Sequence, residues 1–256
     1  MKKTTLSAIK ASACVAAIFI LAQPSIFAED TTVKLNGAPP VALPIKAKQS
    51  DIEAKSGCKL EVILTNNPKG LEALRAGEAD GALLAPSLKK VVDAMNAMRP
   101  GSASADGLQE FTIGQGTVSL IVHPSNPVGA LTMAQARDIL SGKITNWKDV
   151  GGADAAIQVF VLDPSIIPRI VVEDQIMAGT PVTKNAVVRS KPGDMPTLVS
   201  QTPDAISFTG TVLVNASVKA VKLEQPLTFP MICVTKGEPT ASMKAILEAA
   251  KASLGN

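Results

Sequence analysis

The sequence predicts an α/β protein with mostly parallel sheets, and three observations support this fold class. Short β-branched runs alternate with helical segments from Thr31 onward, which is typical of a helix-covered parallel sheet. A polar stretch, Gly101–Gly107, separates this series from a second one, so two lobes are expected. No stretch after the first 28 residues is apolar over a length that would span a bilayer.

The first series contains three strands and three helices in alternation. The strands are expected at residues 31–37, 58–65 and 79–86, and the helices at 45–56, 70–76 and 88–98. The last helix places Val91, Val92 and Met95 on one face. This order favours a βαβ arrangement with both faces of the sheet covered.

The second series starts with a strand at 116–128. Further strands are expected at 157–163, 186–190, 204–210 and 230–239, with short strands or connections between 212 and 223, and helices at 132–141, 166–178 and 240–253. The predicted organisation is a first lobe at 29–116, a second lobe at 117–212, and a return to the first lobe at 213–256.

One passage, Leu131–Gly152, combines a helix with a compact connection. Thr132 is a suitable N-cap, and Ser141-Gly142 supplies a C-terminal stop. Trp147 is expected to anchor the following loop by packing.

The first 28 residues have the features of a secretory signal peptide. Lys2, Lys3 and Lys10 precede or border an apolar run, and cleavage is expected after Ala28. This predicts a soluble protein exported to the periplasm.

Charge and composition exclude several classes of partner and site. The whole chain has 25 basic and 22 acidic residues, and removal of three leader lysines leaves 22 of each, so a nucleic-acid or anionic-membrane footprint is not expected. The single histidine, His123, has no cluster of metal ligands near it and is expected in a loop or at a strand end. Cys58 and Cys233 could pair in an oxidising compartment, but the sequence does not favour a bridge. No cofactor and no metal are expected, and the protein is expected to be a monomer.

Several motifs together resemble a known family. LRAGEADGALLAPSL, HPSNPV, SGKITNW, PDAISFTG and PMICVTKGEPT follow one another in the order found in periplasmic phosphate-binding proteins, the PstS-like solute receptors of ABC transporters. The resemblance implies a type II periplasmic binding protein, in which two α/β lobes joined by crossing hinge strands close on a ligand. It also implies a receptor without catalysis that delivers its solute to an ABC permease.

The loops that hold phosphate in this family are altered here. The resemblance places Pro39 and Pro40 where the family has Ser and Thr, and Ala85 where it has an Asp. In the second lobe, Leu162 takes the position of an Arg, and residues 166–168 replace Ser-Gly-Thr. The family's phosphate cage is therefore expected to be largely lost.

Six residues remain as candidate ligand contacts from these loops. They are Ala38, Asn66, Asn67, Lys69, Ser165 and Arg169. For the two asparagines and Ser165, helix capping is the favoured alternative role. For Arg169, the favoured alternative is a solvated or salt-bridged position.

Three functional classes follow. The first is a periplasmic receptor that binds a small anion or another small solute between the lobes. The second is a degenerate binding-protein fold that serves a periplasmic protein partner. The third, a hydrolase, is disfavoured because a Ser-His-Asp order and a nucleophile elbow are missing.

Overall fold

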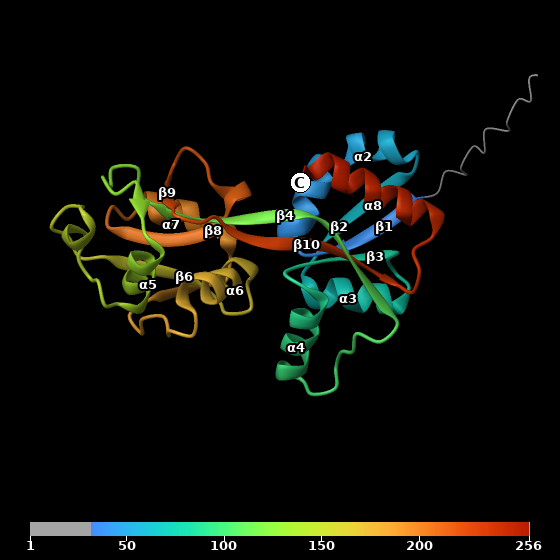
Figure 1. Cartoon of the computed structure of the whole chain (residues 1–256), viewed down its shortest axis with the longest axis horizontal. Coiled ribbons are helices and arrows are strands. Elements are labelled where there is room, and N and C mark those ends of the chain that lie inside the picture. The colour runs from blue at the N-terminus through green and yellow to red at the C-terminus, as the bar shows by residue number, and fades with distance from the viewer. Residues whose placement is uncertain (1–31, 256) are drawn as a thin grey trace, which may run out of the picture.

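The computed structural model describes residues 32–255, which form two α/β lobes joined by two long crossing strands (Figure 1). The crossing strands are β4 (Leu108–Val122) and β10 (Leu227–Lys236). The sheet order is β2-β1-β3-β10-β4-β8-β6-β7. The expected signal peptide lies outside the described residues.

The first lobe has a parallel sheet with helices on both faces. Its strands are β1 (Thr32–Gly37), β2 (Lys59–Leu64) and β3 (Gly81–Leu84). Its helices are α1 (Pro39–Ala47), α2 (Gln49–Ser56), α3 (Asn67–Ala76), α4 (Leu88–Met98) and α8 (Ala241–Leu254). Helices α3 and α4 lie on one side of the sheet, and α2 and α8 on the other (Figure 1). One face packs into a buried apolar cluster that includes Ile52 and Ile246 and continues into the second lobe, and the other face packs into a separate cluster that includes Leu74 and Val91.

The second lobe repeats the pattern with shorter elements. Its strands are β5 (Ala130–Leu131), β6 (Gln158–Leu162), β7 (Val187–Arg189), β8 (Ala205–Gly210) and β9 (Lys219–Leu223). Its α-helices are α5 (Met133–Ser141), α6 (Ile167–Val172) and α7 (Met195–Ser200). A π-helical turn, η2 (Glu173–Met177), continues α6, and 3-10 turns are η1 (Trp147–Val150), η3 (Pro192–Asp194) and η4 (Thr211–Leu213).

The pairing pattern distinguishes the lobes from their connection. β6 runs parallel to both β7 and β8, whereas β10 is antiparallel to β3 and β4, and β4 is antiparallel to β8. The predicted fold class, two α/β lobes with mostly parallel sheets joined by crossing hinge strands, is confirmed.

After residue 213, the chain forms a strand that pairs with strands of the second lobe. β9 pairs with β4, Val221 opposite Leu120, and with β5, Leu223 opposite Leu131. Because these partners belong to the second lobe, the chain remains there until it enters β10. We therefore propose that the return to the first lobe takes place within β10.

Three other elements differ from the sequence-based expectation. The helix expected at 45–56 is two helices, and the first begins at Pro39 because proline is well suited to the first helical turn. β4 begins at Leu108, eight residues before the expected strand, because its first half is a partly exposed crossing strand with interspersed polar residues. Helix α7 was not expected.

Local signals in Leu131–Gly152 are confirmed. The Thr132 hydroxyl accepts from the Gln135 N–H at 3.1 Å, and the Gln135 side chain accepts from the Thr132 N–H at 2.9 Å. Gly142 ends α5 in the left-handed conformation with φ 79°. Trp147 is buried, and His123 directly follows the last residue of β4, as expected.

Within residues 32–255, no helix is both long enough and apolar enough to cross a membrane.

Both cysteines of the described chain are free and buried. Cys233 lies on the central strand β10, and burial raises the pKa of its thiol to about 12. The thiol therefore stays protonated over the physiological pH range and is a poor nucleophile.

We expect iodoacetamide to leave Cys233 unmodified in the folded protein at neutral pH, because the thiolate is scarce and the side chain is covered. Denaturant without reductant should make Cys58 and Cys233 fully reactive, as measured by mass spectrometry. Rapid modification of the folded protein would contradict the burial argument. Protection that persists in denaturant would reveal a disulfide.

Candidate functional site

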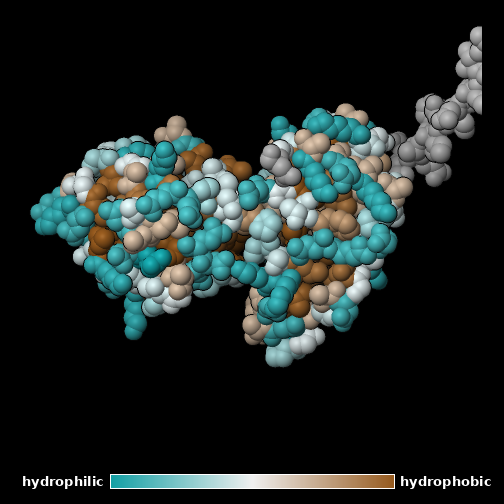
Figure 2. Space-filling view, viewed as in Figure 1, coloured by the Kyte–Doolittle hydropathy of each residue, from teal (hydrophilic) through white to brown (hydrophobic). Residues whose placement is uncertain are grey.

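The candidate site is a cleft of about 1520 Å³ between the lobes. It lies where strands of both lobes end, since Ala38, Thr65 and Ala85 follow β1, β2 and β3, and Asp163 follows β6. Ligands of open α/β sheets bind beyond the carboxyl ends of the strands, so the position is that of a binding site. The molecule narrows between the two lobes (Figure 2).

The cleft lining is apolar and rich in proline. Eight prolines contribute to it: Pro39, Pro40, Pro68, Pro86, Pro164, Pro168, Pro181 and Pro192. Aliphatic and methionine side chains from both lobes complete much of the wall: Leu43, Val91, Met95, Met98, Ile166, Ile167, Ile170, Met177, Val212 and Leu213. Proline has no backbone N–H, so many lining positions offer a ligand only carbon surface or a carbonyl.

The start of α1 supplies no free hydrogen-bond donor to the cleft. Its first two positions are Pro39 and Pro40, and the N–H of Ala38 donates to the Leu83 carbonyl at 2.9 Å. The Val41 N–H turns back to the Ala38 carbonyl at 3.0 Å. Helix starts bind anions through exposed N–H groups, and here these groups are missing or engaged.

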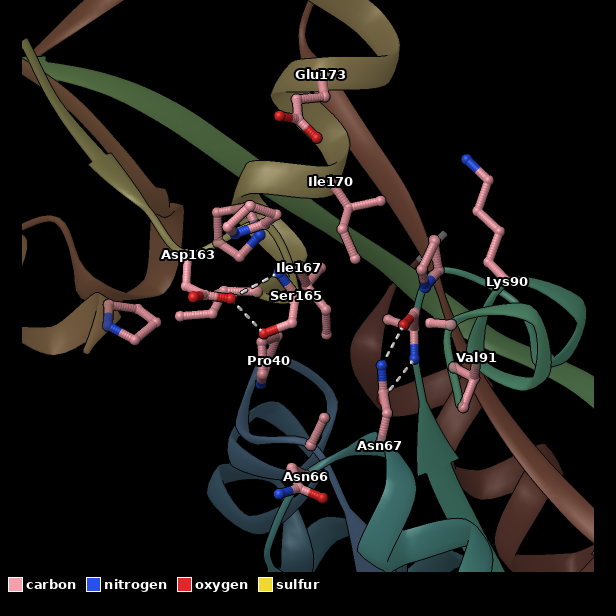
Figure 3. A pocket seen from close by; sticks show the side chains of 18 of the residues that line it. Pro40, Asn66, Asn67, Lys90, Val91, Asp163, Ser165, Ile167, Ile170 and Glu173 are labelled. Atoms are coloured by element: carbon pink, nitrogen blue, oxygen red, sulfur yellow. Dashed lines mark hydrogen bonds between the residues drawn. The ribbon is translucent and has the colours of Figure 1, made fainter. Parts of the chain in front are cut away.

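The start of α3 is closed by its own side chains. Asn66 is the N-cap, as expected from the sequence, because its carbonyl oxygen accepts from the Lys69 N–H at 2.9 Å. Asn67 bridges to the loop after β3, donating to the Ala85 carbonyl at 2.7 Å and accepting from the Ala85 N–H at 3.3 Å (Figure 3). Pro68 removes the next N–H.

The loop before α6 has a self-contained polar turn. The Ser165 hydroxyl donates to Asp163 Oδ1 at 2.7 Å, and the Ser165 N–H donates to the same oxygen at 3.0 Å (Figure 3). These two hydrogen bonds, with a smaller contribution from Arg169, lower the pKa of Asp163, so its carboxylate is ionised. The capping role expected for Ser165 is wrong, because Ile166 is the N-cap of α6.

The cleft carries more acidic than basic side chains. Its lining includes Asp93, Asp163, Glu173, Asp174 and a single lysine, Lys90. Three of the carboxylates pair with cations: Asp174 with Lys90 at 3.5 Å, Glu173 with Arg169 at 2.7 Å, and Asp93 with Lys89 at 2.6 Å. The Lys90–Asp174 pair connects α4 of the first lobe to η2 of the second. Within the described residues, Asp163 has no ion-pair partner.

The structure brings four of the six candidate residues to the cleft and leaves two outside its lining. Ala38, Asn66, Asn67 and Ser165 line the cleft. Lys69 is exposed on α3 away from the lining. Arg169 is 7% exposed; its Nε donates to Glu173 and its Nη1 to the Leu162 carbonyl at 3.3 Å. For Arg169, the structure therefore shows the salt-bridged position that was expected as the alternative to a ligand contact.

Sequence reasoning did not select Asp163, Pro164, Ile170 or Met95 as site residues. For Asp163, a usable signal was present: it is the first residue after an apolar strand, where parallel strands deliver side chains to a common edge. For Ile170 and Met95, the signal was absent, because an apolar helix position can equally well face the core.

Within residues 32–255, no group of three His, Cys, Asp or Glu side chains is placed to hold a metal ion.

Two α/β lobes, crossing strands and a cleft at the strand ends define a type II periplasmic binding protein. A family model described as a PBP superfamily domain matches residues 25–227. The chain belongs to this superfamily of periplasmic binding proteins, and the predicted resemblance to its PstS-like members is confirmed.

Solved structures agree with this assignment. A putative phosphate ABC transporter substrate-binding protein with bound phosphate from Clostridium perfringens has 26% identity and a TM-score of 0.69, covering 86% of this chain and 92% of that one. An ABC-type phosphate transport receptor from Vibrio cholerae has 24% identity and a TM-score of 0.61, over 86% and 93% of the two chains. The reduced OxyR regulatory domain from Pseudomonas aeruginosa shares the fold at 8% identity, with a TM-score of 0.61 over 87% and 98%. Resemblance to phosphate receptors supports a solute-binding protein.

Proposed function

We propose that this protein is a periplasmic receptor that binds a small solute between its lobes, without catalysis, and presents it to an ABC permease. The support is the family, the cleft at the strand ends and the resemblance to phosphate transport receptors. Binding of a solute by both lobes would favour the closed arrangement, because contacts to the second lobe form only on closure.

We further propose that the solute is not inorganic phosphate bound in the family manner. The observation that carries this proposal is that proline removes at least one backbone N–H from the first turn of each of the helices α1, α3 and α6. Proline occupies the first or second position of each helix. The backbone N–H at the third helical position, in Val41, Lys69 and Arg169, already donates to the N-cap residue of its own helix. A dianion that left water here would lose hydration without receiving equivalent donors, which costs several kcal/mol. The ionised carboxylate of Asp163 adds repulsion.

We expect calorimetric titration of phosphate into the mature protein to give a dissociation constant weaker than about 1 mM, corresponding to roughly 4 kcal/mol of binding free energy. The Clostridium perfringens protein, whose structure has bound phosphate, serves as the positive control under the same buffer conditions. Micromolar affinity would overturn this proposal.

The alternative is a degenerate binding-protein fold that serves a periplasmic protein partner. It is favoured by the exposed apolar side chains at the cleft, since large exposed apolar patches often mark protein contacts. In vivo crosslinking through a photoreactive residue at Met98 separates the two functions. Capture of the permease supports the receptor, and capture of another periplasmic protein in place of the permease supports the alternative.

A further inference from the structure

We propose that the cleft selects an organic cation with an apolar body, which places its positive group against Asp163. This inference rests on the proposed receptor function and specifies its class of solute. Two features of the cleft carry it: the carbon surface of the wall and the position of the Asp163 carboxylate, which has no ion-pair partner among residues 32–255.

The apolar body of the solute is inferred from the exposed apolar side chains in the wall of the cleft. Leu43, Met98 and Val212 are 37%, 82% and 63% exposed, and all three line this cleft. They come from both lobes, on α1, α4 and η4. Apolar surface left in water is stabilised when a ligand covers it, at about 25 cal/mol per Å². A small polar solute would cover little of this surface, whereas a hydrophobic body reaches several of these side chains together.

The positive group of the solute is inferred from the carboxylates that line the cleft. Asp93, Glu173 and Asp174 each have a cationic partner, so their charges are largely compensated. Asp163 is held by the hydroxyl and N–H of Ser165, which are neutral donors that preserve its negative charge. Arg169 lies near enough to influence Asp163, but it is buried and its Nε is bonded to Glu173. The Asp163 carboxylate is therefore available to attract a cation in the cleft, and it repels an anion.

The polar turn also orients this charge. Both hydrogen bonds from Ser165 go to Oδ1 of Asp163, which leaves Oδ2 as the oxygen not engaged by that turn. Asp163 and Ser165 lie on the cleft side of the loop, opposite Pro40 of the first lobe (Figure 3). An ammonium group that approaches Oδ2 would sit at the strand end, with the apolar remainder of the solute directed along the wall.

The test uses three probes that share one body and differ in their polar group: 1-naphthylmethylammonium, 1-naphthalenemethanol and 1-naphthoate. Titration of the mature protein by calorimetry should give the tightest binding for the ammonium probe, about fivefold tighter than for the alcohol. The carboxylate probe should bind most weakly. Equal affinities, or a preference for the carboxylate, would overturn the proposal, as would absence of binding by all three.

The Asp163→Asn variant isolates the charge, because its amide oxygen can still accept from Ser165. We expect it to remove the difference between the ammonium and alcohol probes while the affinity for the alcohol is retained. Asp149→Asn, an exposed carboxylate of the same lobe outside the cleft lining, is the matched control and should keep the wild-type order. An unchanged order in folded Asp163→Asn would refute the role of this residue. Phosphate binding would overturn the non-phosphate proposal, whereas a wrong probe order overturns only the cation inference.

Discussion

Trp147→Ala is expected to lower the free energy of unfolding by about 3 to 5 kcal/mol, the range for removal of a large buried aromatic side chain. Trp147 is 1% exposed and belongs to the principal apolar cluster of the protein. Its indole N–H donates to the Asp204 carbonyl at 3.0 Å, and its backbone N–H donates to the Ala155 carbonyl at 2.9 Å. The side chain thus ties the connection after α5 to the turn that precedes β8.

Urea unfolding followed by far-ultraviolet circular dichroism measures this effect, because the substitution removes the only tryptophan of the chain as a fluorescence probe. Trp147→Phe is the matched control, since it retains most of the apolar volume and removes the bond to Asp204. It should cost about 0.5 to 1.5 kcal/mol, the net contribution of one hydrogen bond, because the Asp204 carbonyl still accepts from the Gln158 N–H at 3.0 Å. A loss below about 1 kcal/mol for the alanine variant would show that the cavity collapses or that the site is not a stabilising contact.

The contrast between predicted and observed features follows from the range of the interactions involved. Helix caps act over three or four residues, so Thr132 and Asn66 could be identified from their neighbours alone. The start of β4 at Leu108 depends on pairing with β10, more than one hundred residues away in the sequence. Its polar residues reflect a strand that leaves one lobe for the other, which no local alternation encodes.

The candidate site shows the same division. Ala38 and Asn67 could be selected because the resemblance to the family assigns them to its ligand loops, and the structure brings both to the cleft. Lys69 and Arg169 lie outside the lining because each residue along an α-helix is rotated by about 100° from the preceding one. The spacing of Arg169 and Glu173 in the sequence, four residues, was the sign that this arginine could be satisfied within its own helix. Cleft composition could not be predicted, since it depends on which helix faces meet across the hinge.

Gly37→Ala is the second substitution with a large expected effect, because it introduces a Cβ where two strands approach through their backbones. Gly37 is the last residue of β1 and lies opposite Leu83 of β3 in the parallel register. A Cβ built here would lie 1.9 Å from the Leu83 carbonyl oxygen and 2.6 Å from its carbonyl carbon. A backbone neighbour cannot rotate away as a side chain does, so β1 and β3 would have to separate.

We expect Gly37→Ala to lower the free energy of unfolding by about 3 kcal/mol, at the upper end of the range for overpacked interiors. Gly129→Ala is the matched control: Gly129 is exposed, a Cβ there meets no atom within 4 Å, and its cost should stay within about 0.5 kcal/mol. Both variants can be compared by urea unfolding, and equal stability would contradict the close approach of the strands. The Gly37 carbonyl accepts from Thr65, and the Leu83 carbonyl accepts from Ala38. Since Thr65 and Ala38 both line the cleft, separation of these strands should also weaken solute binding, which links the packing of the first lobe to the geometry of its site.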